Sequence, residues 1–148
     1  MALAVIDMQY AFSCSGAVIE AVCKEIRKAR RNKEPIYNVM YRGGGSVFKK
    51  VRKELKKGPF VELYKKDQGG GLELRRALLK AKALKRVNKV RFCGIYADQC
   101  VFDTANELAK LEKFLLVEIM CRSVESADGA ESGYGFPRTR AKNLKIVK

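Results

Sequence analysis

Short apolar runs alternate with amphipathic runs along the whole chain. This pattern is typical of repeated β-α units around a mostly parallel sheet. No repeat, linker or low-complexity stretch interrupts it, so we predict one domain, residues 1–148. The apolar runs predict strands over residues 2–6, 35–40, 60–64, 90–93, 113–120 and 144–147.

Between these runs, apolar residues recur at helical spacing. The first helix follows Ser13 or Ser15, either of which suits an N-cap, and ends near Arg31. Ser46 is the expected cap of the second helix, which ends before Gly58. Two further helices are expected over residues 74–84 and 101–108, and a loop over residues 126–135.

Length and composition suit a soluble globular protein. The chain has 148 residues, of which 47% are apolar, enough for one sizeable core. No apolar stretch approaches the ~20 residues of a membrane span, and no basic segment precedes the first strand. Five cysteines without a CxxC motif favour reduced thiols. We therefore expect a cytoplasmic protein without a membrane partner.

The chain contains no histidine. This removes the usual general base and the commonest metal ligand, so acid–base chemistry falls to Asp, Glu, Lys, Tyr or Cys. Two glycine triplets, residues 43–45 and 69–71, match neither common nucleotide-binding motif. We expect no metal and no cofactor.

The formal charge of +15 is concentrated in the middle of the chain. Residues 24–91 hold 23 Lys and Arg but six Asp and Glu, a net charge of +17. The charge fits a solvated surface, attraction of an anionic substrate, or weak binding of nucleic acid or an acidic partner. No RNP, KH or zinc-finger pattern accompanies it, so nucleic acid is not the expected partner.

Two strand-like runs end in polar or nucleophilic residues. Residues 2–6 lead into Asp7-Met8-Gln9-Tyr10-Ala11-Phe12, and the later run leads into Gly94-Ile95-Tyr96-Ala97-Asp98-Gln99-Cys100-Val101, then Phe102-Asp103-Thr104-Ala105. Open parallel sheets bind ligands beyond such strand ends. The motifs resemble D-M-Q-x-x-F and G-x-x-x-D-x-C-V, followed by T-A, of the isochorismatase-like cysteine hydrolases. The resemblance implies a three-layer α/β/α fold with a mostly parallel six-stranded sheet in the order 3-2-1-4-5-6.

The resemblance also implies a catalytic triad. Cys100 would be the nucleophile, Asp7 would move protons, and a lysine after the third strand would keep Asp7 charged. Lys65 and Lys66 both qualify, and Lys65 is preferred because it shares a strand face with Val61 and Leu63. A helix beginning near Cys100 is expected to lower the pKa of its thiol.

The remaining expectations concern the pocket and the reaction. Backbone N–H groups of Ala97 and Cys100 would form an oxyanion hole. We predict cleavage of a C–N bond in a small amide or ureido substrate by a homo-oligomer. The alternative is a basic binding protein on a degenerate hydrolase fold. Four aromatic residues could line the pocket or simply pack: Tyr10, Phe12, Tyr41 and Tyr96.

Overall fold

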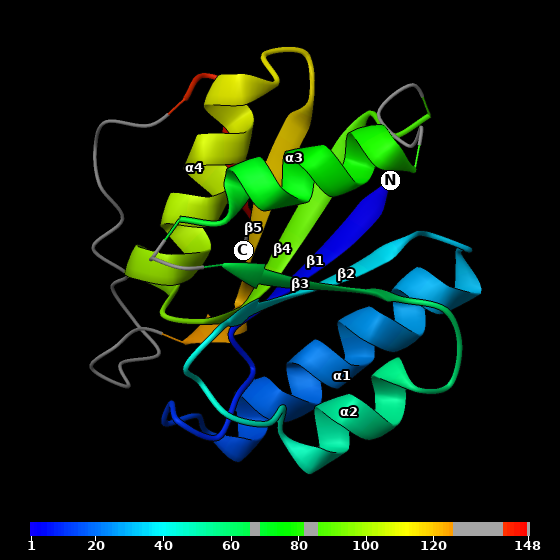
Figure 1. Ribbon diagram of the computed structural model, residues 1–148, viewed down its shortest axis with the longest axis vertical. Helices are drawn as coiled ribbons and strands as arrows, with labels where there is room; N and C mark the ends of the chain where they lie inside the picture. The colour runs from blue at the N-terminus through cyan, green and yellow to red at the C-terminus, as the bar shows by residue number, and fades with distance from the viewer. Residues whose placement is uncertain (66–68, 82–85, 126–140, 148) are drawn as a thin grey trace.

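The computed structural model describes residues 1–65, 69–81, 86–125 and 141–147, with backbone alone at residues 121–123 and 125. Strands and helices alternate through most of this part (Figure 1). The strands are β1 (Ala2–Ile6), β2 (Ile36–Tyr41), β3 (Val61–Lys65), β4 (Lys89–Ile95), β5 (Leu116–Glu125) and β6 (Leu144–Val147). The helices are α1 (Gly16–Arg31), α2 (Lys49–Leu55), α3 (Gly71–Lys80), the π-helical turn η2 (Ala97–Val101) and α4 (Phe102–Leu111).

All six strands lie parallel in one sheet, in the order β3-β2-β1-β4-β5-β6. The predicted strand order is confirmed. Helices α1 and α2 cover one face of this sheet, and α3 and α4 cover the other (Figure 1). The chain therefore has the predicted three-layer α/β/α architecture.

The strand β1 shows why the central strands are continuous apolar runs. Leu3 and Val5 face the α1–α2 layer, whereas Ala4 and Ile6 face the α3–α4 layer. All four side chains are fully buried. A strand covered on both faces needs apolar side chains at every position, which favours runs over alternation.

Helix starts agree only in part with the sequence. Ser15 is the N-cap of α1, and its hydroxyl accepts a hydrogen bond from Val18 N–H at 3.2 Å. The Ser46 cap predicted for α2 is wrong: Phe48 occupies the N-cap position without a side-chain hydrogen bond. Ser46 instead offers its carbonyl oxygen to Tyr10 N–H at 3.0 Å.

Other boundaries shift by a few residues. The strand β5 begins three residues later than predicted and extends to Glu125. Helix α3 begins at Gly71 and ends at Lys80, with Ala81 as its C-cap, so it starts and stops before the predicted bounds of 74 and 84. The predicted loop over residues 126–135 falls outside the described residues. In the described part, no helix combines the length and the apolar character needed to cross a membrane.

Candidate active site

The site lies where β1 and β4 end side by side, at the point where the strand order of the sheet reverses direction. The pairing of β1 with β4 runs to Ile6 opposite Gly94. Gly94 has φ +143°, and a Cβ there would lie 2.1 Å from the Ile6 carbonyl oxygen. Only glycine lets the two backbones come this close. Asp7 follows β1 directly, and Cys100 lies in the turn after β4.

Asp7 and Lys65 form an ion pair with no exposure to solvent. Lys65 Nζ lies 2.7 Å from Asp7 Oδ2, and both side chains are 0% exposed. Lys65 is the last residue of β3, two strands away from β1, so its side chain crosses the end of β2. Removing two charges from water is costly, so a fully buried pair is weak evidence for a stabilising role.

The packing around Lys65 comes from the α3–α4 layer. A Cβ added to Gly70, just before α3, would lie 3.2 Å from Lys65 Cδ and 3.4 Å from Thr104 Oγ1. Thr104 donates its hydroxyl to the Cys100 carbonyl oxygen at 2.7 Å. The charge of Lys65 also acts on the neighbouring Asp103: burial raises the pKa of the Asp103 carboxyl, and the Lys65 charge opposes that rise. Sequence reasoning missed these contacts, although Asp103 and Thr104 belong to the second motif.

Cys100 lies in η2, the π-helical turn that leads into α4. Burial raises the pKa of its thiol to about 11, the Lys65 charge opposes this, and the charge of Asp7 and a hydrogen bond with it add to the rise. The expected lowering of this pKa is therefore wrong, because burial has the largest effect on the thiol. The resting site holds a neutral thiol beside a buried ion pair.

Two of the residues bordering the site have unfavourable backbone conformations. Asp7 has φ +51° and Tyr96 has φ +58°, at the ends of β1 and β4. Residues other than glycine rarely adopt such angles, and the surrounding structure must hold them there. Strain of this kind clusters at functional sites, so its position beside the thiol and the ion pair favours a functional interpretation.

Gln9 fixes the loop that follows β2, a role that sequence reasoning missed. Its amide nitrogen donates to the carbonyl oxygens of Tyr41 at 3.0 Å and Gly45 at 2.9 Å, and its oxygen accepts from Tyr41 N–H at 2.8 Å. Gln9 is 1% exposed. It was visible in the D-M-Q motif, but nothing in the sequence indicated its partners.

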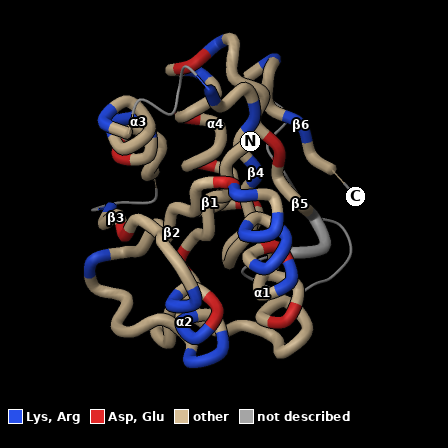
Figure 2. Tube along the Cα trace, turned by 90° about the vertical axis from the view of Figure 1, so that its right-hand side faces the viewer, with Lys and Arg blue, Asp and Glu red and all other residues tan. Residues whose placement is uncertain are grey.

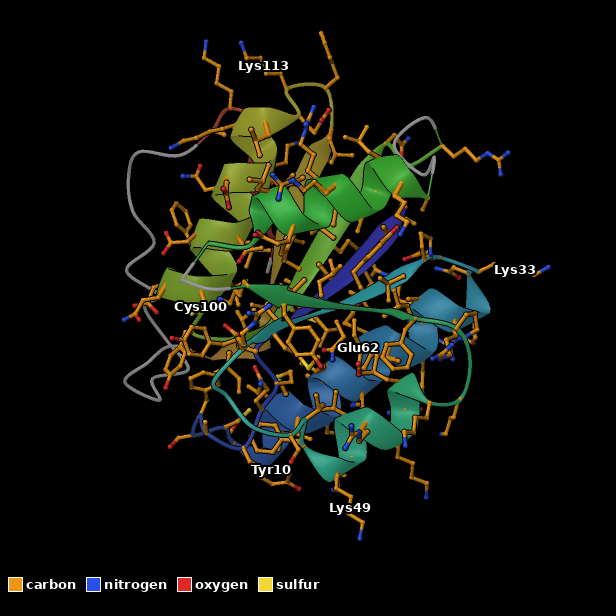
Figure 3. The ribbon with its side chains drawn as sticks, viewed as in Figure 1. Tyr10, Lys33, Lys49, Glu62, Cys100 and Lys113 are labelled. Carbon is orange, nitrogen blue, oxygen red and sulfur yellow. The ribbon has the colours of Figure 1, made fainter. Side chains whose placement is uncertain are left out.

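The four aromatic candidates divide into two groups. Phe12 contacts Tyr96 edge to face, with ring centroids 5.3 Å apart, and lies 6.5 Å from Tyr41. Tyr10 packs instead against Phe48, at 4.8 Å, and its hydroxyl accepts a hydrogen bond from Lys49 N–H (Figure 3). Phe12, Tyr41 and Tyr96 thus remain together as candidate lining residues, whereas Tyr10 is directed toward α2.

The remaining predicted site residues are placed as follows. Ala97 and Cys100 both lie in η2, of which Ala97 is the first residue, and the oxyanion hole predicted from their N–H groups stays a prediction. Lys66 lies outside the described residues. Within the described ranges, no group of three or more His, Cys, Asp or Glu side chains gathers to hold a metal ion. Two surface cavities, of about 480 and 630 Å³, are lined by residues of other parts of the fold.

Comparisons with solved structures identify the fold. The MAR1 ribonuclease of Caenorhabditis elegans is 24% identical over 85% of this chain, with a TM-score of 0.70. This chain spans 65% of the length of that protein. The N-carbamoylsarcosine amidase of Thermoplasma acidophilum is 19% identical, with 98% of this chain and 94% of that chain covered and a TM-score of 0.71.

A third solved structure, an isochorismatase family protein, is 16% identical and covers 99% of this chain and 97% of its own, with a TM-score of 0.75. The sequence itself matches no protein-family model and no curated protein. The fold is that of the isochorismatase-like hydrolases, as the two sequence motifs predicted.

Proposed function

We propose that the protein is a cysteine hydrolase that cleaves a C–N bond of a small amide or ureido compound. The observation that carries the proposal is the fully buried Asp7–Lys65 pair beside the Cys100 thiol. A charge pair enclosed in this way, next to a nucleophile at the ends of β1 and β4, has the composition of a catalytic site. The isochorismatase-like fold and its amidase neighbour support the same chemistry.

In the proposed reaction, Asp7 accepts the thiol proton as Cys100 Sγ attacks the carbonyl carbon. The C–N bond then breaks, Asp7 returns that proton to the leaving nitrogen, and a thioester remains on Cys100. Asp7 next takes a proton from water, whose oxygen attacks the thioester, and the thiolate regains the proton. The neutral resting thiol fits this scheme, because the proton is still present for Asp7 to take.

Lys65 would keep Asp7 ionised between these proton transfers. The backbone N–H groups of Ala97 and Cys100 would hold the carbonyl oxygen as it becomes negative. Phe12, Tyr41 and Tyr96 would contact the substrate. We propose a homo-oligomer as the active form, and no metal or cofactor is part of the mechanism.

The test is turnover of a panel of small amides, ureido compounds and lactams, with detection of released ammonia or amine. Cys100→Ala should abolish turnover, because it removes the nucleophile. Cys14→Ala is the matched control: Cys14 is also a partly buried cysteine, outside the triad, and its loss should leave the rate unchanged. Mass spectrometry of the stopped reaction should find the acyl group on Cys100.

Turnover that survives Cys100→Ala, or an acyl group on another cysteine, would contradict the assignment. The alternative, a binding protein on a degenerate hydrolase fold, predicts that no substrate of the panel is cleaved. Asp7→Asn keeps the shape of the side chain but leaves the buried Lys65 charge without its partner, so circular dichroism must first show that this variant is folded. The folded variant should bind substrate analogues but not turn substrate over.

A further inference from the structure

The outer surface of α1 and α2 carries a concentration of positive charge. Every exposed residue of α2 is a lysine or an arginine, and further exposed cations follow it or lie on α1. Figure 2 shows these basic segments on the two helices, and Figure 3 shows Lys49 extending away from the fold. We call this surface the basic face and define it by eight exposed residues: Lys24, Lys28, Arg31, Lys49, Lys50, Arg52, Lys53 and Lys56.

The cations of the two helices share one surface. The pKa of Glu20, on α1, is lowered by a hydrogen bond with Arg27 and further by the charges of Lys50 and Lys24. Lys50 belongs to α2 and Lys24 to α1, so both lie close enough to act on the same carboxylate. Ion pairs also bridge the helices, because Arg27 Nη1 lies 3.1 Å from Glu54 Oε1.

The acidic residues of this layer are already paired. From residue 16 to residue 57 the chain has four carboxylates and no more. Glu20 and Glu54 pair with Arg27, Glu54 also pairs with Lys57, and Glu25 and Glu34 pair with Arg91 on β4. Among the described residues, the eight cations of the basic face have no ion-pair partner.

This distribution opposes the stability of α2. Lys49 and Lys53 are four residues apart, as are Arg52 and Lys56, and like charges at this spacing repel. The first turn of α2 has no acidic residue, and its lysines oppose the helix dipole. A surface that served solubility alone would not require cations at each exposed position of a seven-residue helix.

We propose that the basic face binds the phosphate backbone of nucleic acid without reading its sequence. Among the described residues, the exposed large apolar side chains lie outside α1 and α2. A membrane-binding helix needs such side chains among its cations, and the centre of a protein interface is usually aromatic or aliphatic. A phosphate backbone requires cations alone. This inference does not depend on the proposed hydrolase activity.

The length of the basic face sets the expected strength of binding. Helix α1 has 16 residues and is about 24 Å long, enough to pass several phosphates of a duplex. If five cations contact phosphates, the slope of log K against log salt should be about −4.5. Between 50 and 200 mM salt, affinity should then fall by about 500-fold.

The experiment uses the whole protein and fluorescent 20-base-pair duplexes of two unrelated sequences, as RNA and as DNA, with anisotropy measured over this range of salt. The test variant is Lys28→Gln/Lys50→Gln/Lys53→Gln/Lys56→Gln. The matched control, Lys80→Gln/Lys110→Gln/Lys113→Gln/Lys145→Gln, removes four exposed lysines from α3, α4, the β5 approach and β6. Both variants lose the same net charge.

The test variant should bind at least tenfold more weakly at 100 mM salt, and its salt slope should fall by about 3.6 if all four lysines contact phosphates. The control should change affinity by less than threefold. Thermal melting should show the test variant at least as stable as the wild type, since repulsion is relieved. Within RNA, and likewise within DNA, the two sequences should bind with equal affinity, whichever of the two nucleic acids binds better.

Three results would overturn the proposal. The first is no duplex binding by the wild type at 50 mM salt. The second is an equal loss in the two variants, which would assign any binding to net charge instead of to this face. The third is equally strong binding of polyglutamate or of vesicles containing phosphatidylserine, which would show a partner other than nucleic acid.

Discussion

Replacing Lys65 by Met should strongly destabilise the fold. The substitution keeps most of the aliphatic side chain but leaves the Asp7 carboxylate at a fully buried position without its partner. At 2.7 Å the pair has a Coulomb energy of about 6 kcal/mol for an effective dielectric constant of ~20. Measured losses on breaking such pairs are about 3–5 kcal/mol, because the remaining charge stays buried without a partner. A loss of that size is a large part of a typical free energy of unfolding, about 5–15 kcal/mol.

Lys89→Met is the matched control. Lys89 Nζ lies 2.9 Å from Glu118 Oε1, but the two side chains are 29% and 13% exposed. Solvent screens this second pair, so the same substitution should cost about 1 kcal/mol or less. The comparison therefore separates burial of the pair from the chemistry of the substitution.

The assay is urea unfolding followed by far-ultraviolet circular dichroism, since the chain has no tryptophan. In the double variant Asp7→Asn/Lys65→Met neither charge is left, so its loss should be at least ~2 kcal/mol smaller than the sum of the single losses. Additive losses, or a Lys65→Met deficit no larger than that of Lys89→Met, would refute the reasoning.

Two further predictions test the thiol and the strand junction. The charge of Asp7 and its hydrogen bond raise the pKa of Cys100, so Asp7→Asn should speed iodoacetamide labelling of Cys100 at pH 8 while turnover is lost. Labelling is followed by mass spectrometry of the Cys100 peptide, and slower labelling would contradict this prediction. Gly94→Ala should destabilise the protein by more than ~3 kcal/mol in urea unfolding or prevent folding, because the added Cβ meets the Ile6 backbone. Gly16→Ala, whose added Cβ would have no atom within 4 Å, should instead stabilise the protein by about 0.5–1 kcal/mol. A Gly94→Ala protein of wild-type stability would show that the two strands can separate there.

The elements whose signal is strong in the sequence were predicted well. Buried parallel strands are short apolar runs, and β1 and β6 agree with the predicted bounds. Strand phase also favoured Lys65 over Lys66, and Lys65 Nζ is the amine found against Asp7. The strand order required the family resemblance, because apolar runs do not say which strands are neighbours.

Other features depend on contacts that a sequence does not display. Ser46 is a residue type that often caps helices, but here its carbonyl oxygen accepts a hydrogen bond from Tyr10 N–H. Helix α2 begins later, at Lys49. The π-helical turn differs from an α-helical start by one residue in its hydrogen bonding, which no residue type marks. The pKa of Cys100 depends on how deeply the turn is buried, and that depth is set by the packing of the whole layer.

Several features that cost this chain stability lie at the two proposed functional surfaces. At the ends of β1 and β4 it keeps a buried ion pair and two residues in left-handed conformations. On α2 it keeps repelling lysines and an N-terminus without a side-chain cap. Apolar residues in the core, or carboxylates among the lysines, would serve folding better. Since a sequence under selection for stability alone would remove such features, their retention at two separate surfaces supports a catalytic site at one and a polyanion-binding face at the other.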